Sequence, residues 1–313
     1  MSDNLAIVIT GCDTGIGAEI TEDLYQRGGF IIYATCLTQA AVNRYKSLNS
    51  FRVRASIVDV TKQADVDKLQ ILVEHENPLG IYCLLNNAGV NDGSFFDLTN
   101  VESYERTMQV NYLGLVRMTK ALLPSLRTYA KTRLNTCLPR ARLLCITSIA
   151  GSINIPGVSG YCASKHAAES FLDTIRVELK PWEINVSILE PCGTKTPLCA
   201  AMSSNFERIW KNAPLLVQNM YGMQFMEITR NACDQSYKDA MPTQKVADAA
   251  VRVIMQSHYN QTRCVIGPWW FGIMIFINSW IPTKLMDSLT CITMRKNGTW
   301  PSDPFLLNES KQK

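Results

Sequence analysis

Residues 5–17 read Leu-Ala-Ile-Val-Ile-Thr-Gly-Cys-Asp-Thr-Gly-Ile-Gly, and this stretch decides the fold. The uncharged run from Leu5 to Thr10, rich in β-branched residues, predicts a strand that is buried on both faces of a parallel sheet. Three glycines with the spacing G-x-x-x-G-x-G follow, and residues 18–27 then have helical periodicity. A strand, a glycine-rich turn and a helix in this order predict the first βαβ unit of a dinucleotide-binding domain.

The glycine-rich turn has a physical reason to bind a dinucleotide. Glycines permit a tight turn and a close approach of backbone amides to a pyrophosphate, and the next helix points the positive end of its dipole there. Tight turns also use glycine for their own sake, so the position between strand and helix carries the inference. The predicted cofactor contacts in this turn are Gly11, Asp13, Thr14, Gly15, Ile16 and Gly17.

The end of the second predicted strand, residues 30–35, bears on the choice between NAD and NADP. NAD enzymes usually place an acidic residue there, and NADP enzymes place an arginine nearby. Residues 36–39 are Cys-Leu-Thr-Gln and provide neither, while Asp13 would repel a 2′-phosphate. We therefore expect a preference for NAD, although Arg44 and Lys46 on the next predicted helix could still reach the site.

Two further predicted strands, residues 53–58 and 81–85, add cofactor contacts. Asp59 follows the first of them, where its carboxylate could accept from the adenine amino group or cap the helix predicted over 62–74; both roles can hold. Residues 86–89 follow the second and are Asn-Asn-Ala-Gly, small enough for a cofactor to lie against the strand end. The predicted contacts are Thr38, Asp59, Asn87, Ala88 and Gly89.

The candidate catalytic residues follow the fifth predicted strand, residues 143–147. Ser148 lies at the carboxyl end of that strand, where ligands bind in a parallel sheet of this kind. Tyr161 and Lys165 lie one turn apart on the next predicted helix, where an ammonium group would favour the tyrosinate and lower its pKa from about 10. Tyr161 could then act as a general acid/base, although the same spacing occurs by chance on ordinary helix faces.

Two features of the middle of the chain stand out. Asn111 lies in a long helical stretch, residues 101–126, where an asparagine is unfavourable unless it faces solvent or has a task. Residues 128–142 are polar and basic and contain a proline, which predicts a solvated surface loop. Contact of that loop with a membrane surface or a partner stays open.

Together these stretches resemble the short-chain dehydrogenase/reductase family, in the family's order and spacing, over residues 5 to about 200. The matching features are residues 10–17, Asp59, residues 86–89, Asn111, Ser148, Tyr161 with Lys165, and the turn at Pro191. Within the family the chain is most similar to retinol dehydrogenases and 17β-hydroxysteroid dehydrogenase-like enzymes. The resemblance implies an α/β fold: a doubly wound, seven-stranded parallel sheet, or Rossmann fold, with helices on both faces. The residues that follow this sheet predict a helical, apolar C-terminal segment.

The resemblance also implies hydride transfer between a nicotinamide and a hydrophobic alcohol or carbonyl. Tyr161 would be the acid/base, and Lys165 would lower its pKa and hold the nicotinamide ribose. Ser148 would orient the substrate oxygen and stabilise the developing alkoxide. Asn111 would anchor a water that links Lys165 to solvent, and Thr196 would hold the nicotinamide carboxamide.

Two departures from the family pattern bear on this implication. Cys192 stands after Pro191 where the family has glycine, which reduces the expected backbone room near the nicotinamide. Residues 128–142 are about ten residues longer than in typical relatives, but they lie far in sequence from the catalytic residues. We therefore expect activity to be retained.

The sequence divides the chain into three predicted parts. Residues 1–266 form one dehydrogenase domain, whose helical segment 197–245 covers the substrate or simply packs as core. Residues 267–295 form a hydrophobic lid or a membrane-associating segment, and 296–313 a polar tail. The run 267–283 has no charge and three tryptophans, which suits insertion into one face of a membrane beside the substrate entrance. A buried lid or dimer contact, and a true membrane span, are the alternatives.

Composition narrows the function classes. The chain has 313 residues, a net charge of +4 and no basic stripe with aromatics, so we expect no nucleic-acid partner. Eleven cysteines without a C-x-x-C pair predict reduced thiols. The three histidines, His75, His166 and His258, lack metal-ligand spacing, so we expect no metal. Without a signal peptide at the start, we expect an intracellular, membrane-associated protein that faces the cytosol, as on the endoplasmic reticulum.

The sequence therefore predicts an NAD-preferring oxidoreductase of lipid metabolism that acts on a lipophilic alcohol or ketone, retinoid or steroid-like. One alternative is an NADPH-dependent carbonyl reductase of other lipophilic ketones. Another is a dinucleotide-sensing module without catalysis. Homo-oligomerisation stays open, because family members are often dimers or tetramers.

Overall fold

The computed structural model describes residues 5–298 apart from 49, 135, 257–260 and 279. These residues form one seven-stranded sheet in the order β3-β2-β1-β4-β5-β6-β7, with every neighbouring pair parallel. This confirms the predicted fold class. The strands are β1 Leu5–Ile9, β2 Phe30–Cys36, β3 Val53–Ile57, β4 Cys83–Asn86, β5 Arg142–Ile146, β6 Asn185–Pro191 and β7 Arg263–Ile266.

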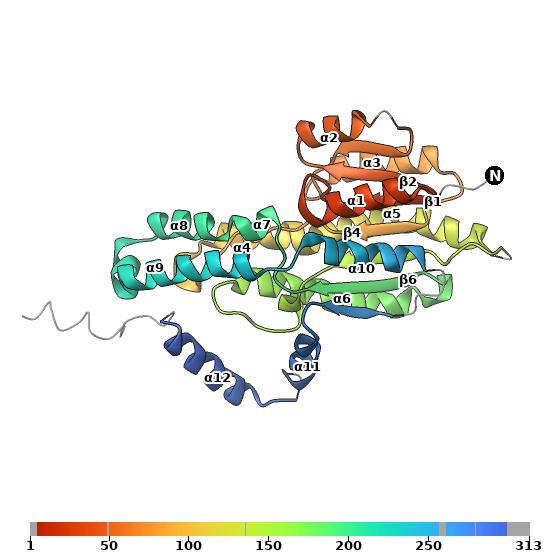
Figure 1. Cartoon of the computed structure of the whole chain (residues 1–313). Helices are drawn as coiled ribbons and strands as arrows, with labels where there is room; N and C mark the ends of the chain where they lie inside the picture. The colour runs from red at the N-terminus through yellow and green to blue at the C-terminus, as the bar shows by residue number, and fades with distance from the viewer. Residues whose placement is uncertain (1–4, 49, 135, 257–260, 279, 299–313) are drawn as a thin grey trace, which may run out of the picture.

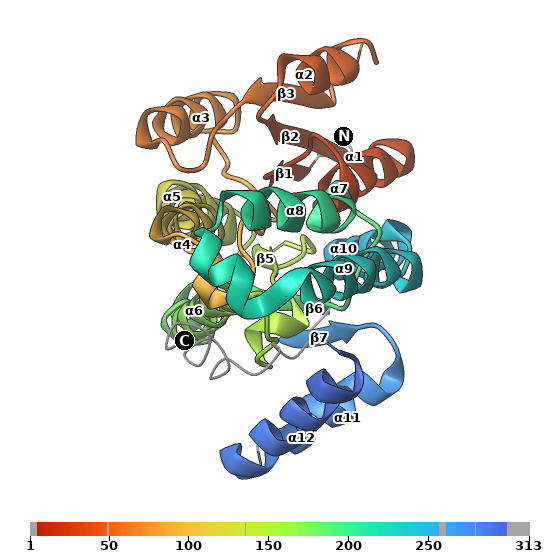
Figure 2. The ribbon, with the colours of Figure 1, turned by 90° about the vertical axis from the view of Figure 1, so that its left-hand side faces the viewer.

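Helices cover both faces of the sheet, as Figure 2 shows. Helices α1 and α10 lie against one face, and α3, α5 and α6 against the other. Such parallel sheets are buried on both sides, which explains why the strands read as apolar runs. The helices that surround the sheet are α1 Gly15–Arg27, α2 Gln39–Lys46, α3 Gln63–Glu76, α4 Val101–Met108, α5 Leu115–Thr132, α6 Ser159–Glu178 and α10 Thr243–Met255.

The strand order places the functional crevice. Strand β1 lies between β2 and β4, so the chain runs outward in one direction from β1 to β3 and in the other from β4 to β7. Connections leave β1 and β4 toward opposite sides, and ligands bind outside the carboxyl ends of the strands at such a switch point. The central strand residues Ile7, Val8 and Ile9 are fully buried and hold this edge rigid.

The prediction of a surface loop over 128–142 is wrong at both ends. Helix α5 continues to Thr132, and Arg142 is the first residue of β5 with only 1% of its surface exposed. The Arg142 guanidinium donates to the Tyr82 hydroxyl at 2.8 Å and to the Gln256 carbonyl. A buried cation is tolerated when its N–H groups are hydrogen-bonded. The prediction assigned Arg142 to the surface loop because it is basic and follows a polar stretch, and this assignment is wrong.

The long helix predicted over 101–126 is not uniform. The α-helical turns of α4 pass into a π-helical turn, η2 Gln109–Gly114, before α5 begins. The other short turns are η1 Phe96–Leu98, η3 Ile149–Gly151 and η4 Lys180–Trp182. Single π-turns inside helices often mark functional sites. Asn111 lies in this turn and is buried, so its side-chain amide needs hydrogen-bond partners inside the protein.

A helical layer projects beyond the sheet (Figure 1). It consists of α7 Pro197–Ala200, α8 Met202–Asn212 and α9 Leu215–Asp239. A second hydrophobic core lies between this layer and η1, formed by Leu98, Phe206, Ile209, Trp210, Ala213 and Phe225. The aromatic residues of 197–245 thus serve in part as ordinary core. Leu215 and Leu216, by contrast, are mostly exposed.

The apolar run 267–283 does not form one long helix. Helix α11 covers Trp269–Asn278 and begins shortly after β7, whereas α12 covers Thr283–Lys296 and lies away from the sheet, below α9 in the view of Figure 1. Within the part of the chain that is described, the search for a helix long and apolar enough to span a membrane finds none. Most of the predicted polar tail, residues 299–313, lies outside the described residues.

Candidate active site

A cavity of about 1110 Å³ opens at the carboxyl ends of the strands. One half lies against the ends of β1, β2 and β4, and we call it the cofactor half. The other half is bounded by α7, α8, α9 and α12, and we call it the lid half. Most predicted site residues line this one cavity: Gly11, Asp13, Thr14, Gly15, Ile16, Thr38, Asp59, Asn87, Ala88, Gly89, Ser148, Tyr161, Lys165 and Thr196.

The glycine-rich turn has the geometry of a dinucleotide cradle. Gly11 and Gly15 have φ of +71° and +61°, a region that other residues rarely adopt. A Cβ added to Gly17 would overlap with the Gly11 carbonyl oxygen, so α1 begins directly against the turn. Gly17 does not line the cavity itself; it permits the close packing of the N-terminus of α1 against the turn. The cradle therefore fits a pyrophosphate.

Asp13 organises the end of β2. Its carboxylate accepts from the backbone amides of Leu37 at 2.8 Å and Thr38 at 2.9 Å, and from the Thr38 hydroxyl at 2.8 Å. Arg44 does reach the turn: its guanidinium donates to the carbonyl oxygens of Asp13 at 3.0 Å and Cys12 at 3.1 Å. The expected ribose end thus has a carboxylate and a guanidinium side by side.

Asn87 and Asp59 are both anchored at the edge of the cofactor half. The Asn87 amide donates to the carbonyl oxygens of Thr10 at 2.8 Å and Gly11 at 3.0 Å, and so ties β4 to the glycine-rich turn. Asp59 accepts from the amide and hydroxyl of Thr61, and these bonds outweigh its burial and lower its pKa. Asp59 therefore stabilises a turn and still faces the cavity.

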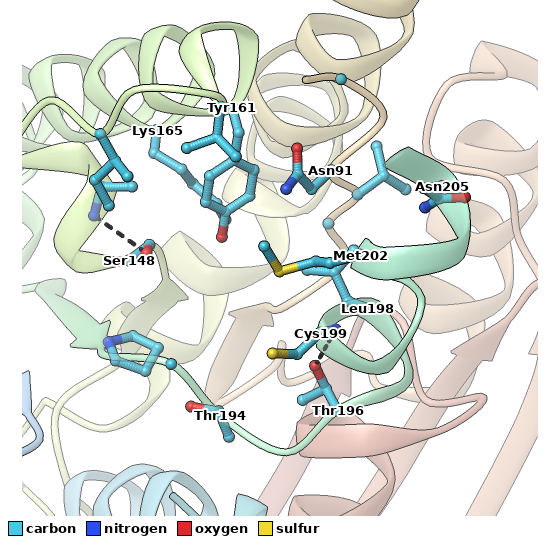
Figure 3. A pocket seen from close by; sticks show the side chains of 18 of the residues that line it. Asn91, Ser148, Tyr161, Lys165, Thr194, Thr196, Leu198, Cys199, Met202 and Asn205 are labelled. Atoms are coloured by element: carbon cyan, nitrogen blue, oxygen red, sulfur yellow. Dashed lines mark hydrogen bonds between the residues drawn. The ribbon is translucent and has the colours of Figure 1, made fainter. Parts of the chain in front are cut away.

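The three candidate catalytic side chains come from two elements. Ser148 follows β5, and Tyr161 and Lys165 lie one turn apart on α6. Figure 3 shows the Tyr161 hydroxyl pointing into the cavity near Ser148, opposite Met202 of the lid half. The Lys165 ammonium donates to the Ile146 carbonyl at 3.3 Å and lies 5.6 Å from the centre of the Tyr161 ring.

The expected lowering of the Tyr161 pKa is not found in this arrangement. Burial raises the pKa of Tyr161 to about 12, and its hydrogen bond with Ser148 only partly opposes this. Burial also lowers the pKa of Lys165 to about 8, against the opposing charge of Glu169. The largest cause of both shifts is the same, because burial penalises the charged form of each group.

Asn111 acts as a clamp. Its amide nitrogen donates to the Val90 carbonyl and the Ser164 hydroxyl, both at 2.9 Å, and its oxygen accepts from the Val90 amide at 2.8 Å. Asn111 does not line the large cavity. Its side chain thus connects the segment after β4 to α6.

Cys192 finds room in an unexpected way. A Cβ on Gly267 would overlap with the Cys192 sulfur, so the cysteine side chain fills the space that Gly267 leaves free. Among the described residues only Glu183 combines a side chain with positive φ, so the backbone at Cys192 does not demand glycine. The departure from the family pattern is therefore accommodated by a second glycine, 75 positions later in the chain.

Sequence reasoning missed the individual residues of the lid half. Leu198, Cys199 and Met202 face Tyr161 across the cavity in Figure 3. Helix α12 contributes Met286 and Leu289 to the lining. The apolar composition of both segments was a signal for packing or lid, but nothing in the periodicity tells which apolar residues face the cavity.

Comparisons with known proteins agree with this geometry. The short chain dehydrogenase family profile matches residues 5–206. The chain is 29% identical to rat 17-beta-hydroxysteroid dehydrogenase type 6, over 93% of this chain and 89% of that protein. It is 30% identical to rat retinol dehydrogenase 16, over 90% and 86%. A short chain dehydrogenase/reductase from Burkholderia phymatum, solved in complex with NAD, superposes with a TM-score of 0.70 at 19% identity, over 97% and 98%.

Proposed function

The chain belongs to the short-chain dehydrogenase family, and we propose that it oxidises or reduces a neutral, lipophilic alcohol or ketone of retinoid or steroid-like size. The lining of the lid half carries this proposal. Leu198, Met202, Phe206, Met286 and Leu289 give it an apolar surface. Among the described lining residues there is no arginine and no lysine but Lys165, so nothing there would pair with a substrate carboxylate.

In the proposed reaction the chain supplies binding, orientation and proton transfer. The bound nicotinamide would accept or donate the hydride. The glycine-rich turn would hold the pyrophosphate, and Lys165 would hold the ribose. Tyr161 would take the hydroxyl proton of the alcohol in oxidation and return it in reduction. Ser148 would donate to the same oxygen and hold it beside Tyr161.

We propose NAD as the preferred cofactor. Leu37 is 62% exposed at the end of β2, where an NADP enzyme would place a cation, and the Asp13 carboxylate lies beside it. Arg44 favours the alternative of an NADPH-dependent carbonyl reductase, because its guanidinium reaches the same turn. However, the two terminal nitrogens of Arg44 each donate a hydrogen bond to a backbone carbonyl, which leaves fewer N–H donors for a phosphate.

We also propose that α11 and α12 associate with a lipid surface, on a membrane that the protein reaches from the cytosol. Trp269, Phe276 and Trp280 are 79%, 67% and 77% exposed, an unusual density of exposed aromatics. Lys284 and Arg295 on α12 would suit anionic headgroups. Because α12 also lines the lid half, a substrate dissolved in lipid could enter the cavity beside it.

The experiment is a substrate and cofactor panel with the whole protein in liposomes. Retinol, 3-hydroxy- and 17-hydroxysteroids, medium-chain secondary alcohols and a short hydroxy acid are each offered with NAD⁺ or NADP⁺, and absorbance at the wavelength of the reduced cofactor is followed. Turnover of a neutral lipophilic alcohol with NAD⁺, and none of the hydroxy acid, is expected. Turnover of the hydroxy acid alone would overturn the substrate class, and a preference for NADP⁺ would overturn the cofactor.

A further inference from the structure

A cluster of charged side chains lies behind the candidate active site. Glu169 of α6 and Glu190 of β6 are 4% and 0% exposed, and Arg263 of β7 forms ion pairs with both. The Ser152 hydroxyl lies between the same two carboxylates, 3.3 Å from Glu169 and 2.9 Å from Glu190. At the rim, Asp173 accepts from Arg263 at 2.8 Å. The cluster therefore joins three elements of the sheet layer.

The cluster touches each element that carries a candidate catalytic side chain. Glu169 lies one helical turn after Lys165 on α6, on the same face. Ser152 ends the turn that Ser148 begins, and Glu190 directly precedes Pro191 on the cavity edge. A Cβ on Gly151 would overlap with the Glu169 carboxylate, so this glycine lets the carboxylate lie directly against the Ser148 turn.

The arrangement is costly if it has no task. Two almost fully buried carboxylates of like charge lie against each other and share the guanidinium of Arg263, whose side chain is 33% exposed. Burial and the Glu169 charge raise the pKa of Glu190 well above its ordinary value. Glu169 is the carboxylate of the pair that lies on α6, on the helix that carries Lys165.

We propose that Glu169 is a positioning residue of the active site: its carboxylate, held in place by Arg263, favours the ammonium form of Lys165 one helical turn away, and its contact with Ser152 fixes the turn that carries Ser148. The role in turnover rests on the proposed function, but the effect on Lys165 does not. The other titratable groups near Lys165 are Tyr161 on α6 and Cys145 on β5. Asp173 faces Arg263 and Arg176 and is 44% exposed at its side chain.

The test measures the pKa of Lys165 directly in the whole protein. Acetic anhydride acetylates only neutral amines, so the rate of Lys165 acetylation against pH, read by peptide mass spectrometry, gives the pKa without substrate or cofactor. In Glu169→Gln we expect this pKa to fall by about one unit, because the nearest opposite charge is lost. In Asp173→Asn, which also contacts Arg263 but lies at the rim, we expect no change.

The results for these variants distinguish an effect of Glu169 on the pKa of Lys165 from an effect on protein stability alone. Glu169→Asp keeps the charge but draws it back by one methylene, so it should show a smaller fall than Glu169→Gln; it also serves if the Gln variant does not fold. A lower melting temperature with an unchanged Lys165 profile in both variants would overturn the proposal. So would an equal fall in Asp173→Asn. If the wild-type protein turns over no alcohol, the proposed function fails while the acetylation result still decides this inference.

Discussion

The cofactor half and the lid half of the cavity are built from different materials. The cofactor half is made of backbone: positive-φ glycines, amides tied by Asp13, and carbonyls tied by Asn87. The lid half is made of apolar side chains on separate helices, several of which expose further apolar groups to solvent. This difference implies that one added methyl group can severely weaken cofactor binding in the cofactor half. The lid half, by contrast, should tolerate side-chain substitutions, which would change only substrate access and substrate choice.

The largest effect among the tests of this comparison is expected in the cofactor half. Gly17→Ala places a Cβ on the Gly11 carbonyl oxygen and must move α1 or the turn. Affinity for NADH, measured by fluorescence titration, should fall by about a hundredfold, some 3 kcal/mol. Gly272→Ala is the matched control, because a Cβ there meets nothing within 4 Å. Equal affinity in both variants would show that the close packing at Gly17 is dispensable.

The pH dependence sharpens the electrostatic part of the account. In the proposed mechanism, oxidation requires Tyr161 deprotonated and Lys165 protonated, and the pKa values of the two groups are about 12 and about 8. Below pH 8 the tyrosinate fraction, and with it kcat/KM, should rise about tenfold per unit; above pH 8 the loss of the ammonium offsets that rise and the profile flattens. An initial-rate profile from pH 6 to 10 tests this. A continued rise above pH 9 would place the Lys165 pKa higher.

Cofactor choice should respond by about tenfold to one added charge. Leu37→Arg puts a guanidinium at the exposed end of β2, where it can pair with a 2′-phosphate. The ratio of kcat/KM for NADP⁺ to that for NAD⁺ should increase by about tenfold, roughly 1.4 kcal/mol. Leu79→Arg, a leucine of the same exposure before β4, should leave the ratio unchanged. If the ratio of kcat/KM for NADP⁺ to that for NAD⁺ were unchanged in Leu37→Arg, the adenosine ribose of the cofactor would not bind near the end of β2.

The smallest effect on chemistry is expected from the outer face of the C-terminal helices. Replacing Trp269, Phe276 and Trp280 by serine should reduce co-sedimentation with anionic liposomes severalfold, because exposed aromatic surface is lost. Turnover of a short, water-soluble alcohol should stay within about twofold of the wild type, since these residues do not line the cavity. Phe51→Ser removes an equally exposed aromatic elsewhere. If it reduced sedimentation as much, the proposed lipid surface would be wrong.

The sequence predicts features that depend on neighbouring residues along the chain. The glycine-rich turn and the five strands predicted between residues 5 and 147 follow from local periodicity, whereas the seven-stranded sheet and the joint role of Tyr161 and Ser148 were implied by the family resemblance. The boundaries of α5 and the burial of Arg142 do not, because the partners of Arg142 lie 60 and 114 positions away. Asn111 carried a readable signal, an unfavourable residue in a helix, but its partner Val90 and the π-turn appear only in three dimensions.

Electrostatics were the least predictable part. The spacing of Tyr161 and Lys165 suggested attraction between their charged forms, whereas burial dominates the pKa of both. Glu169, Glu190 and Arg263 belong to α6, β6 and β7, and no motif connects them. In the same way, the substitution of glycine by Cys192 looked unfavourable until Gly267 was seen beside it. Burial and distant partners decide such questions, and both are properties of the folded chain.

The measurement that tests the central claim most directly compares the wild-type protein with Tyr161→Phe. Reduced-cofactor formation is followed with the best alcohol of the panel, and NADH affinity is measured in parallel. We expect turnover to fall by a factor of about 10² to 10⁴, the usual contribution of a general acid/base, with NADH affinity within about threefold of the wild type. Turnover that survives the loss of the phenolic hydroxyl would contradict the assignment of Tyr161 as the proton-transferring residue.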